Sequence, residues 1–417
     1  MVPTSAHDVV IIGAGLAGLR AAQVLSGRGL DVVVIERAGH LGGRVHSFDL
    51  DGFVIDEGFQ LINPSYPELR ATGVLDDLDL RPFPGLLTYV GTDSRWTLAD
   101  PRRFPLHALA ALLGGHPRPS DAWRLARLFT TARIASAAQL TSVLDRSTRQ
   151  GLLDAGITEE TIDNLLTPFL RGTLLDDELA TSWRYTRLLI KSFASGRPGT
   201  PATGVRQLPL TLRASMPDVS VRLGEHVLRA DPMTVQVDSG QLRARAVLIA
   251  TDATAAAKLL DTPAPGWRST TTWWFSTPRV NQGGRLRLDV DRCTVASMLD
   301  LASVAPERAP QHRSLIAVAA NGLHDERRDS DIGAQVARFY ALDRRDVELL
   351  IRTPVARALP HIALPLKLAT PARRGELFVA GDYLQTPSIQ GALVSGRRAA
   401  LAVLSALGVR DERHNEC

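Results

Sequence analysis

The chain opens with a pattern typical of a buried strand followed by a helix. Residues 9–12 form an uninterrupted apolar run, and leucines and alanines then recur at helical spacing over residues 19–25. A short apolar run predicts a strand buried on both faces, whereas a spacing of three to four residues predicts a helix with one apolar side. A second strand is predicted at residues 31–35, of which the last four are apolar, and it completes a strand–helix–strand unit, which predicts a parallel sheet.

Similar runs recur in the middle and at the end of the chain. Alternating segments on both sides of residues 238–240 predict a hairpin, and a fully apolar strand follows it directly. Near the C-terminal end, another apolar strand precedes a helix that Gly408 ends. These later elements are predicted at residues 233–237, 241–245, 246–250, 377–380 and 388–407.

The intervening segments have a different pattern. Short strands are predicted at residues 86–90 and 95–98, and sheet strands again from residue 270 and at 314–319. Residues 121–144 predict one long helix with an apolar side and several arginines. Such a helix either covers a core, or forms a lid or membrane-surface contact through which an apolar substrate enters.

Three glycines, Gly13, Gly15 and Gly18, lie between the first predicted strand and helix. The first permits a tight turn, the second lets a phosphate approach the backbone, and the third lets the helix pack closely on the strand. The N–H groups at the start of the helix then face two phosphates. We therefore predict that a dinucleotide binds at this turn.

Glu36 ends the second predicted strand, 18 residues after Gly18. A carboxylate at this place accepts hydrogen bonds from the hydroxyls of an adenosine ribose. The alternative is a surface glutamate that merely follows a strand. Because the glycine turn, the helix and the strand precede it in the required order, we prefer the ribose role.

Gly42-Gly43-Arg44 follows the second predicted strand at once. With the opening motif, it resembles the FAD-binding signature of the amine oxidase, phytoene desaturase and protoporphyrinogen oxidase superfamily, and most closely the bacterial phytoene desaturase-like oxidoreductases. NAD-dependent dehydrogenases lack this second glycine pair. The resemblance implies non-covalent FAD, with Arg44 near its pyrophosphate, where a planar guanidinium can bridge two phosphate oxygens.

The resemblance extends over most of the chain and implies further cofactor contacts. Residues 56–60 resemble the segment beside the flavin ring, and Asp382 is expected near the ribitol or pyrophosphate. The helix after Ser388 is expected to direct its N–H groups at the flavin N1 and O2 edge. Val227 either contacts adenine through its backbone or is only a strand residue. The residues expected to bind the cofactor are Gly13, Ala14, Gly15, Ala17, Gly18, Glu36, Arg37, Gly42, Gly43, Arg44, Gly58, Phe59, Val227, Gly381, Asp382, Ser388 and Ile389.

The expected fold class is α/β, with a discontinuous Rossmann-type FAD-binding domain and a mixed α+β substrate domain, as in amine oxidases and phytoene desaturases. The FAD-binding domain is expected to comprise residues 1–78, 204–266 and 359–417. The substrate domain is expected to comprise residues 79–203 and 267–358.

The resemblance leaves three interpretations of function. The first is a desaturase or dehydrogenase acting on an apolar, isoprenoid-like molecule, the second a flavin amine oxidase, and the third a flavin-binding protein without turnover. Amine oxidases usually have a lysine in the substrate-domain sheet, but residues 270–357 contain none. They also place an aromatic cage residue where this chain has Ser388. Both absences favour the first interpretation.

No catalytic residue is identified by the sequence. Gln60, Trp273, Arg279 and Tyr383 are candidates by position alone, and a structural role fits each of them equally well. A second nucleotide-binding signature is absent, so the expected electron acceptor is oxygen or a quinone.

Composition excludes several other classes. Apolar residues make up 45% of the 417 residues, which predicts a packed globular protein. Cys293 and Cys417 are the only cysteines, which suits a reducing cytoplasm and provides no thiol near the last motif to link a flavin. No histidine pair has metal-ligand spacing, no basic run is interleaved with aromatics, and no apolar run could span a bilayer. We expect no metal, no nucleic acid, and a cytoplasmic protein that is either soluble or peripheral to a membrane.

Overall fold

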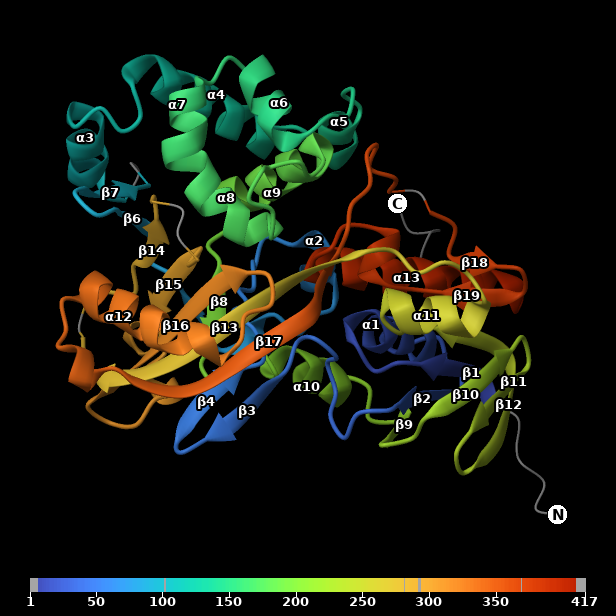
Figure 1. Cartoon of the computed structure of the whole chain (residues 1–417). Coiled ribbons are helices and arrows are strands. Elements are labelled where there is room, and N and C mark those ends of the chain that lie inside the picture. The colour runs from blue at the N-terminus through green and yellow to red at the C-terminus, as the bar shows by residue number, and fades with distance from the viewer. Residues whose placement is uncertain (1–6, 101–102, 281, 292–293, 369, 410–417) are drawn as a thin grey trace.

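Two β-sheets, each covered by helices, organise the structure, which is a computed structural model (Figure 1). It describes residues 7–100, 103–280, 282–291, 294–368 and 370–409. Cys293 and Cys417 lie outside the described residues.

The first sheet is the nucleotide-binding sheet predicted from the apolar runs. Its central strands are parallel in the order β19–β12–β1–β2–β9, and the β10–β11 hairpin extends the first half of β12. The strands are β1 (His7–Ile12), β2 (Val32–Glu36), β9 (Ser220–Leu223), β10 (Val227–Asp231), β11 (Thr234–Val237), β12 (Gly240–Ile249), β18 (Arg373–Arg374) and β19 (Leu377–Val379). Strands from the beginning, middle and end of the chain therefore share one sheet.

One face of this sheet is covered by α1 (Leu16–Ser26) and α13 (Ile389–Ala406), whose apolar sides join its buried core. The two helices pack with their backbones in close approach. A Cβ atom at Gly396 would overlap the carbonyl oxygen of Ala17. Nearby lie the shorter helices α2 (Pro67–Ala71) and α10 (Gln207–Ala214), while α11 (Ala253–Leu260) contributes to the core on the other face.

The second sheet has the order β17–β13–β16–β15–β14–β6–β7 and is antiparallel except where β14 meets β6. Its strands are β6 (Leu86–Val90), β7 (Arg95–Ala99), β13 (Trp267–Pro278), β14 (Leu286–Asp289), β15 (Ser297–Asp300), β16 (Arg313–Asn321) and β17 (Glu348–Pro360). Helix α12 (Asp329–Tyr340) packs on one face. The hairpin of β3 (Ser47–Leu50) and β4 (Phe53–Asp56) packs on the other.

A group of helices, here called the helical cap, lies beside the second sheet (Figure 1). It comprises α3 (Pro105–Leu113), α4 (Pro119–Ile134), α5 (Ala137–Thr141), α6 (Thr148–Asp154), α7 (Glu159–Thr161), α8 (Thr167–Leu174) and α9 (Trp183–Ser195). Leucine, isoleucine and aromatic side chains from α6, α8 and α9 form its core. A short two-stranded sheet of β5 (Leu80–Pro82) and β8 (Gly199–Pro201) connects the chain on either side of the cap. Among the described residues, no helix is sufficiently long and apolar to span a membrane.

The prediction of one helix over residues 121–144 is wrong, because α4 ends at Ile134 and α5 begins at Ala137. Ser136 caps the new helix by accepting a hydrogen bond from the Gln139 N–H over 3.2 Å, and the Gln139 side chain accepts one from the Ser136 N–H over 2.8 Å. This reciprocal capping satisfies two backbone donors that a helix start leaves free. It therefore favours a restart over continuation.

The close packing of α1 and α13 predicts that Gly396→Ala destabilises the protein. The added methyl group must push the two backbones apart, and overpacking of this kind costs about 1–3 kcal/mol. The measurement is the free energy of unfolding in urea. Gly39→Ala is the matched control, since no described atom lies within 4 Å of a Cβ atom there. Equal stability of the two variants would contradict the packing described.

Candidate cofactor site

The glycine turn between β1 and α1 has the predicted geometry. Gly13 has a φ of +107°, and a Cβ atom there would lie 2.8 Å from the Ala250 carbonyl oxygen. A Cβ atom at Gly18 would overlap the carbonyl oxygen of Gly13. In contrast, no described atom lies within 4 Å of a Cβ position at Gly15, which directly precedes α1. The first N–H groups of α1 thus face open space that a phosphate can fill.

The second glycine pair lies against the first turn. The Gly42 N–H donates to the Ala14 carbonyl oxygen over 2.9 Å, and Gly15 and Gly42 form a parallel bridge. A Cβ atom at Gly43 would lie 3.6 Å from the Gly15 Cα atom. The two glycine segments, which are far apart in the sequence, therefore form one continuous surface of backbone atoms.

Glu36 lies at the end of β2, and its carboxylate is oriented by two backbone donors. The N–H groups of Ala14 and Ala38 each donate to it over 2.8 Å, one to each oxygen. Each carboxylate oxygen can accept a further hydrogen bond, which leaves capacity for ribose hydroxyls. The next residue, Arg37, is exposed.

The segment before β10 lies beside this carboxylate. The Glu225 N–H donates to the Glu36 carbonyl oxygen, and the Gly224 N–H to that of Ala38, both over 3.0 Å. Val227 begins β10 two residues later. The adenine contact of Val227 stays a prediction, and its position next to the ribose carboxylate is compatible with it.

Arg44 and Asp382 join the first and last motifs of the chain. Their side chains form an ion pair with an Nη2–Oδ1 distance of 2.7 Å, and Arg44 also donates to the Ala358 carbonyl oxygen over 2.8 Å. Burial alone would lower the pKa of Arg44, but the carboxylate of Asp382 outweighs it and raises the pKa. Arg44 therefore carries a positive charge, and its guanidinium also lies 5.4 Å from the ring centroid of Trp267.

Helix α13 begins at Ile389, seven residues after Asp382, in the last motif of the chain. The Ser388 hydroxyl caps it by accepting a hydrogen bond from the Gly391 N–H over 3.0 Å. A Cβ atom at Gly391 would overlap the Thr386 carbonyl oxygen. The Gly381 N–H donates to the Ser395 hydroxyl over 2.9 Å, which ties the preceding turn to the helix.

Residues 58–60 are also brought to this place. The Gln60 amide donates to the Arg44 carbonyl oxygen over 2.6 Å, and the Phe59 N–H lies 3.3 Å from the Thr272 hydroxyl on β13. Gly58 is buried, with Val355 of β17 beside it. This segment therefore lies between the cofactor motifs and the second sheet.

Tyr383 is largely buried next to Asp382, and its ring lies over Gly381. Within the described part of the chain its hydroxyl has no hydrogen-bond partner. Burial raises the pKa of Tyr383, and the carboxylates of Asp382 and Asp252 raise it further. The hydroxyl is therefore neutral, so that it can donate a hydrogen bond but cannot act as a base.

The other two catalytic candidates lie apart from this group. Trp273 is fully buried against α12, where its indole N–H donates to Asp329 over 2.7 Å. Trp274 points to the opposite face, as expected for adjacent strand residues, and packs with Phe53 and Ile55 of β4. Trp273 therefore has a structural role in the core.

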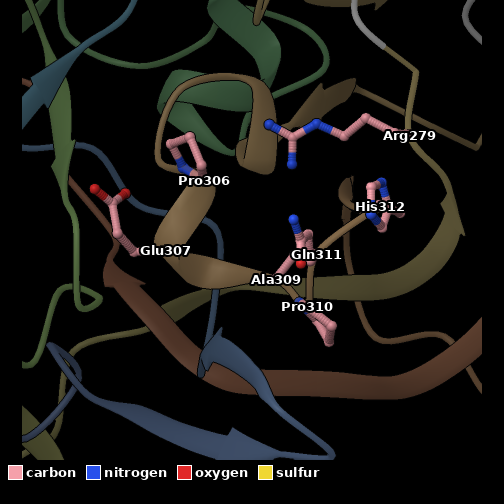
Figure 2. Close-up of a pocket in the computed structure, with 7 residues that line it drawn as sticks. All are labelled: Arg279, Pro306, Glu307, Ala309, Pro310, Gln311 and His312. Atoms are coloured by element: carbon pink, nitrogen blue, oxygen red, sulfur yellow. The ribbon is translucent and has the colours of Figure 1, made fainter.

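Arg279 lines a cavity of about 530 Å³ that no predicted cofactor residue reaches (Figure 2). Its guanidinium donates to the carbonyl oxygens of Ala302 and Arg313. Glu307 and His312 lie on other sides of the same cavity (Figure 2). These backbone contacts give Arg279 a structural role.

One neighbour of the site was not found by sequence reasoning. Tyr185 of α9 is buried, and its hydroxyl donates to the carbonyl oxygen of Pro387, the residue before the α13 cap, over 3.0 Å. The two residues are 202 positions apart, and no local sequence signal singles out Tyr185. Only the fold reveals this contact.

The geometry is that of a dinucleotide-binding protein. Two glycine segments lie together at the start of α1, an oriented carboxylate ends β2, and a charged arginine pairs with an aspartate of the last motif. A family model described as flavin containing amine oxidoreductase matches residues 16–404. The chain belongs to this family, and the predicted fold class and FAD cofactor are confirmed.

Relatives in this family differ in what their names say they act on. Protoporphyrinogen oxidase 2 of Arabidopsis thaliana is 42% identical over 77 residues, 18% of this chain and 15% of that protein. Putrescine oxidase of Kocuria rosea is 42% identical over 77 residues, 18% of this chain and 16% of that protein. Hydroxyneurosporene desaturase of Rubrivivax gelatinosus is 43% identical over 56 residues, 13% of this chain and 11% of that protein. The chain thus aligns with less than a fifth of each relative's length.

Solved structures agree over the whole fold. A protein described as a protoporphyrinogen oxidase from Exiguobacterium sp. 255-15 aligns with a TM-score of 0.70 at 16% identity, covering 98% of this chain and all of that one. A putrescine oxidase variant aligns with a TM-score of 0.70 at 19% identity, covering 97% of this chain and all of that one. At this identity the agreement concerns the fold alone.

Glu36→Ala is predicted to weaken FAD binding about ten- to a hundredfold, because hydrogen bonds to a charged group contribute about 1.5–3 kcal/mol. The measurement is the dissociation constant of FAD from flavin fluorescence. Asp31→Asn is the matched control, since this exposed carboxylate lies just before β2, at its other end. If Glu36→Ala bound FAD as tightly as the control, the ribose assignment would be wrong.

Proposed function

We propose that the chain is an FAD-dependent oxidoreductase that removes a hydride from an apolar, isoprenoid-like substrate, with oxygen or a quinone as the final electron acceptor. The observation that carries this proposal is the apolar lining at the junction of the helical cap, the second sheet and the residue before α13, around a cavity of about 10 Å³, the size of one water molecule, so that a substrate must displace these side chains to bind. The cavity is lined by Leu174, Thr181, Tyr185, Arg268, Leu359, Pro360, Ile362 and Pro387. Most of this lining is apolar, which favours binding by apolar burial.

The charge of this lining disfavours amines. Its one charged residue among those described is a cation, Arg268, which pairs with Asp176 over 3.0 Å outside the lining. An ammonium group in a poorly hydrated cavity requires a nearby anion or an aromatic cage. Neither is supplied by these residues, since Tyr185 is engaged with the Pro387 carbonyl oxygen.

The lysines give independent support. Lys191, Lys258 and Lys367 are the only lysines of the chain, and none belongs to a strand of the second sheet. Lys191 donates from α9 to the carbonyl oxygens of Arg133 and Ala135 in the helical cap. The device that family resemblance associates with amine oxidation is therefore missing from the sheet beside the site.

The chain's own contribution to the chemistry is to bind and orient. FAD, when bound, supplies the hydride acceptor. The free N–H groups in the first turn of α13 would stabilise negative charge that develops at the adjacent ring edge. Tyr383 would keep its proton and donate a hydrogen bond, because burial raises the pKa of its hydroxyl. Gln60 would hold the Arg44 backbone in place.

There are two alternative functions. Similarity to putrescine oxidase supports an amine oxidase, while similarity to hydroxyneurosporene desaturase supports the hydrocarbon substrate. A flavin-binding protein without turnover is the third candidate. The amine-binding features missing from the cavity and the sheet favour the desaturase type over the first alternative.

Anaerobic reduction of the bound flavin distinguishes these functions. Polyenes or other isoprenoid-like hydrocarbons, presented in detergent, should bleach the flavin absorbance, because the side chains at this junction are mostly apolar. Primary amines, polyamines and amino acids should not. Dithionite serves as the control that the flavin can be reduced at all.

Rapid bleaching by a simple amine would restore the amine oxidase. Bleaching by dithionite alone, with every candidate donor inactive, would favour the non-catalytic alternative.

A further inference from the structure

Arg308 is an arginine whose side chain is entirely buried. It ends the short 3₁₀ helix η4 (Pro306–Arg308), which lies in the loop between β15 and β16. Its neighbours Glu307 and Ala309 line the surface cavity shown in Figure 2, whereas the exposed fraction of Arg308 is 0%. A buried charge is costly unless a counter-charge and hydrogen bonds compensate it, so the partners of Arg308 indicate what it holds.

The counter-charge is Asp56, the last residue of β4, whose exposed fraction is only 1%. The Nη2 atom of Arg308 lies 2.8 Å from the Oδ1 atom of Asp56. The same guanidinium donates to the Val54 carbonyl oxygen over 2.9 Å and to the Thr200 hydroxyl of β8 over 3.0 Å. One planar guanidinium therefore connects a loop of the second sheet to the β3–β4 hairpin and to the strand that follows the helical cap.

Asp56 also holds the turn that leads into α10. The Ser47 hydroxyl donates to Oδ1 of Asp56 over 2.7 Å, and the Val205 N–H donates to the same oxygen over 3.2 Å. The Arg206 N–H in turn donates to the Ser47 hydroxyl over 3.1 Å. Three segments that are far apart in the sequence therefore meet at the buried Arg308–Asp56 pair.

This pair lies directly before the segment expected beside the flavin ring. Residues 58–60 reach the hydroxyl of Thr272 on β13 and the backbone of Arg44. Only Glu57 separates them from Asp56. Because this connection is so short, a shift of Asp56 would be passed on to the residues that contact the cofactor motifs.

We propose that Arg308 is a positioning residue for the flavin, which acts through Asp56 by holding residues 57–60 against the cofactor motifs. A buried ion pair adds little stability compared with an apolar pair of the same volume, but removing one partner leaves the other charge uncompensated. The pair is therefore better suited to fix one arrangement of three segments than to stabilise the fold. This inference rests on FAD as the cofactor and on residues 58–60 lying beside its ring, and it does not depend on which substrate the flavin oxidises.

Two measurements that need no substrate test this role. Arg308→Met should speed amide hydrogen exchange in residues 57–60, both without and with FAD, because Asp56 is no longer held. It should also raise the dissociation constant of FAD about tenfold, which corresponds to about 1.4 kcal/mol. Arg308→Lys keeps the charge but loses the planar group that reaches Val54 and Thr200 together, so its values should lie between those of the wild type and of Arg308→Met.

Arg287→Met is the matched control. Arg287 is also buried, with an exposed fraction of 1%, and its guanidinium lies 3.9 Å from the ring centroid of Tyr340 in α12. This variant should lose stability without changing the exchange in residues 57–60 or the affinity for FAD. The proposal is overturned if Arg308→Met matches this control in either measurement. If Arg308→Met does not fold, Arg308→Lys takes its place in the comparison, and a match to the control in either measurement again overturns the proposal.

Discussion

The close backbone contact between α1 and α13 is the constraint on which the cofactor site depends. A side chain at Gly396 would overlap Ala17, and one at Gly18 would overlap the turn that leads into α1. Gly396 lets the two helices approach each other on the same face of the sheet, and Gly18 lets α1 lie close to the turn after β1. As a result, the starts of α1 and α13, from opposite ends of the chain, face the same region, and Arg44 reaches Asp382. Without this contact the two motifs would be separate half-sites.

The second sheet and the helical cap contact the cofactor motifs and supply the apolar side of the site. Residues 58–60 connect the cofactor motifs to β13 and β17, and Tyr185 connects the cap to the residue before α13. A substrate that entered the junction of the cap and the second sheet would meet apolar side chains and one paired arginine. The polar part of the site is thus devoted to the cofactor, whereas the substrate side is apolar. This division is the physical basis for proposing a hydrocarbon over an amine.

Much of this arrangement could be predicted from the sequence, because it depends on local signals. The glycine turns need particular residues at fixed spacing, and the apolar strands are short runs flanked by turns, so β1, α1, β2, the hairpin of β11 with the first half of β12, and α13 were predicted correctly, whereas the two strands predicted at residues 241–245 and 246–250 are one strand, β12. The break at residues 135–136 was missed because a capping box can interrupt an otherwise helical pattern. Helix α3 was not predicted because its sequence, PLHALAALL, has no polar side, so no alternation of apolar and polar residues marks a helical period. The structural roles of Trp273 and Arg279 and the contact of Tyr185 depend on tertiary packing, which no single segment encodes.

The pairing of Arg44 with Asp382 tests most directly whether the two ends of the chain form one FAD site. The measurement is the dissociation constant of FAD for Arg44→Met, Asp382→Asn and the double variant. Removing Arg44 alone should be the most damaging change, because it leaves the buried Asp382 carboxylate unpaired beside the pyrophosphate. Asp382→Asn should then partly restore binding, with a coupling energy of about 0.5–3 kcal/mol. Losses that simply add, with no rescue in the double variant, would contradict the account of a single site built from both termini.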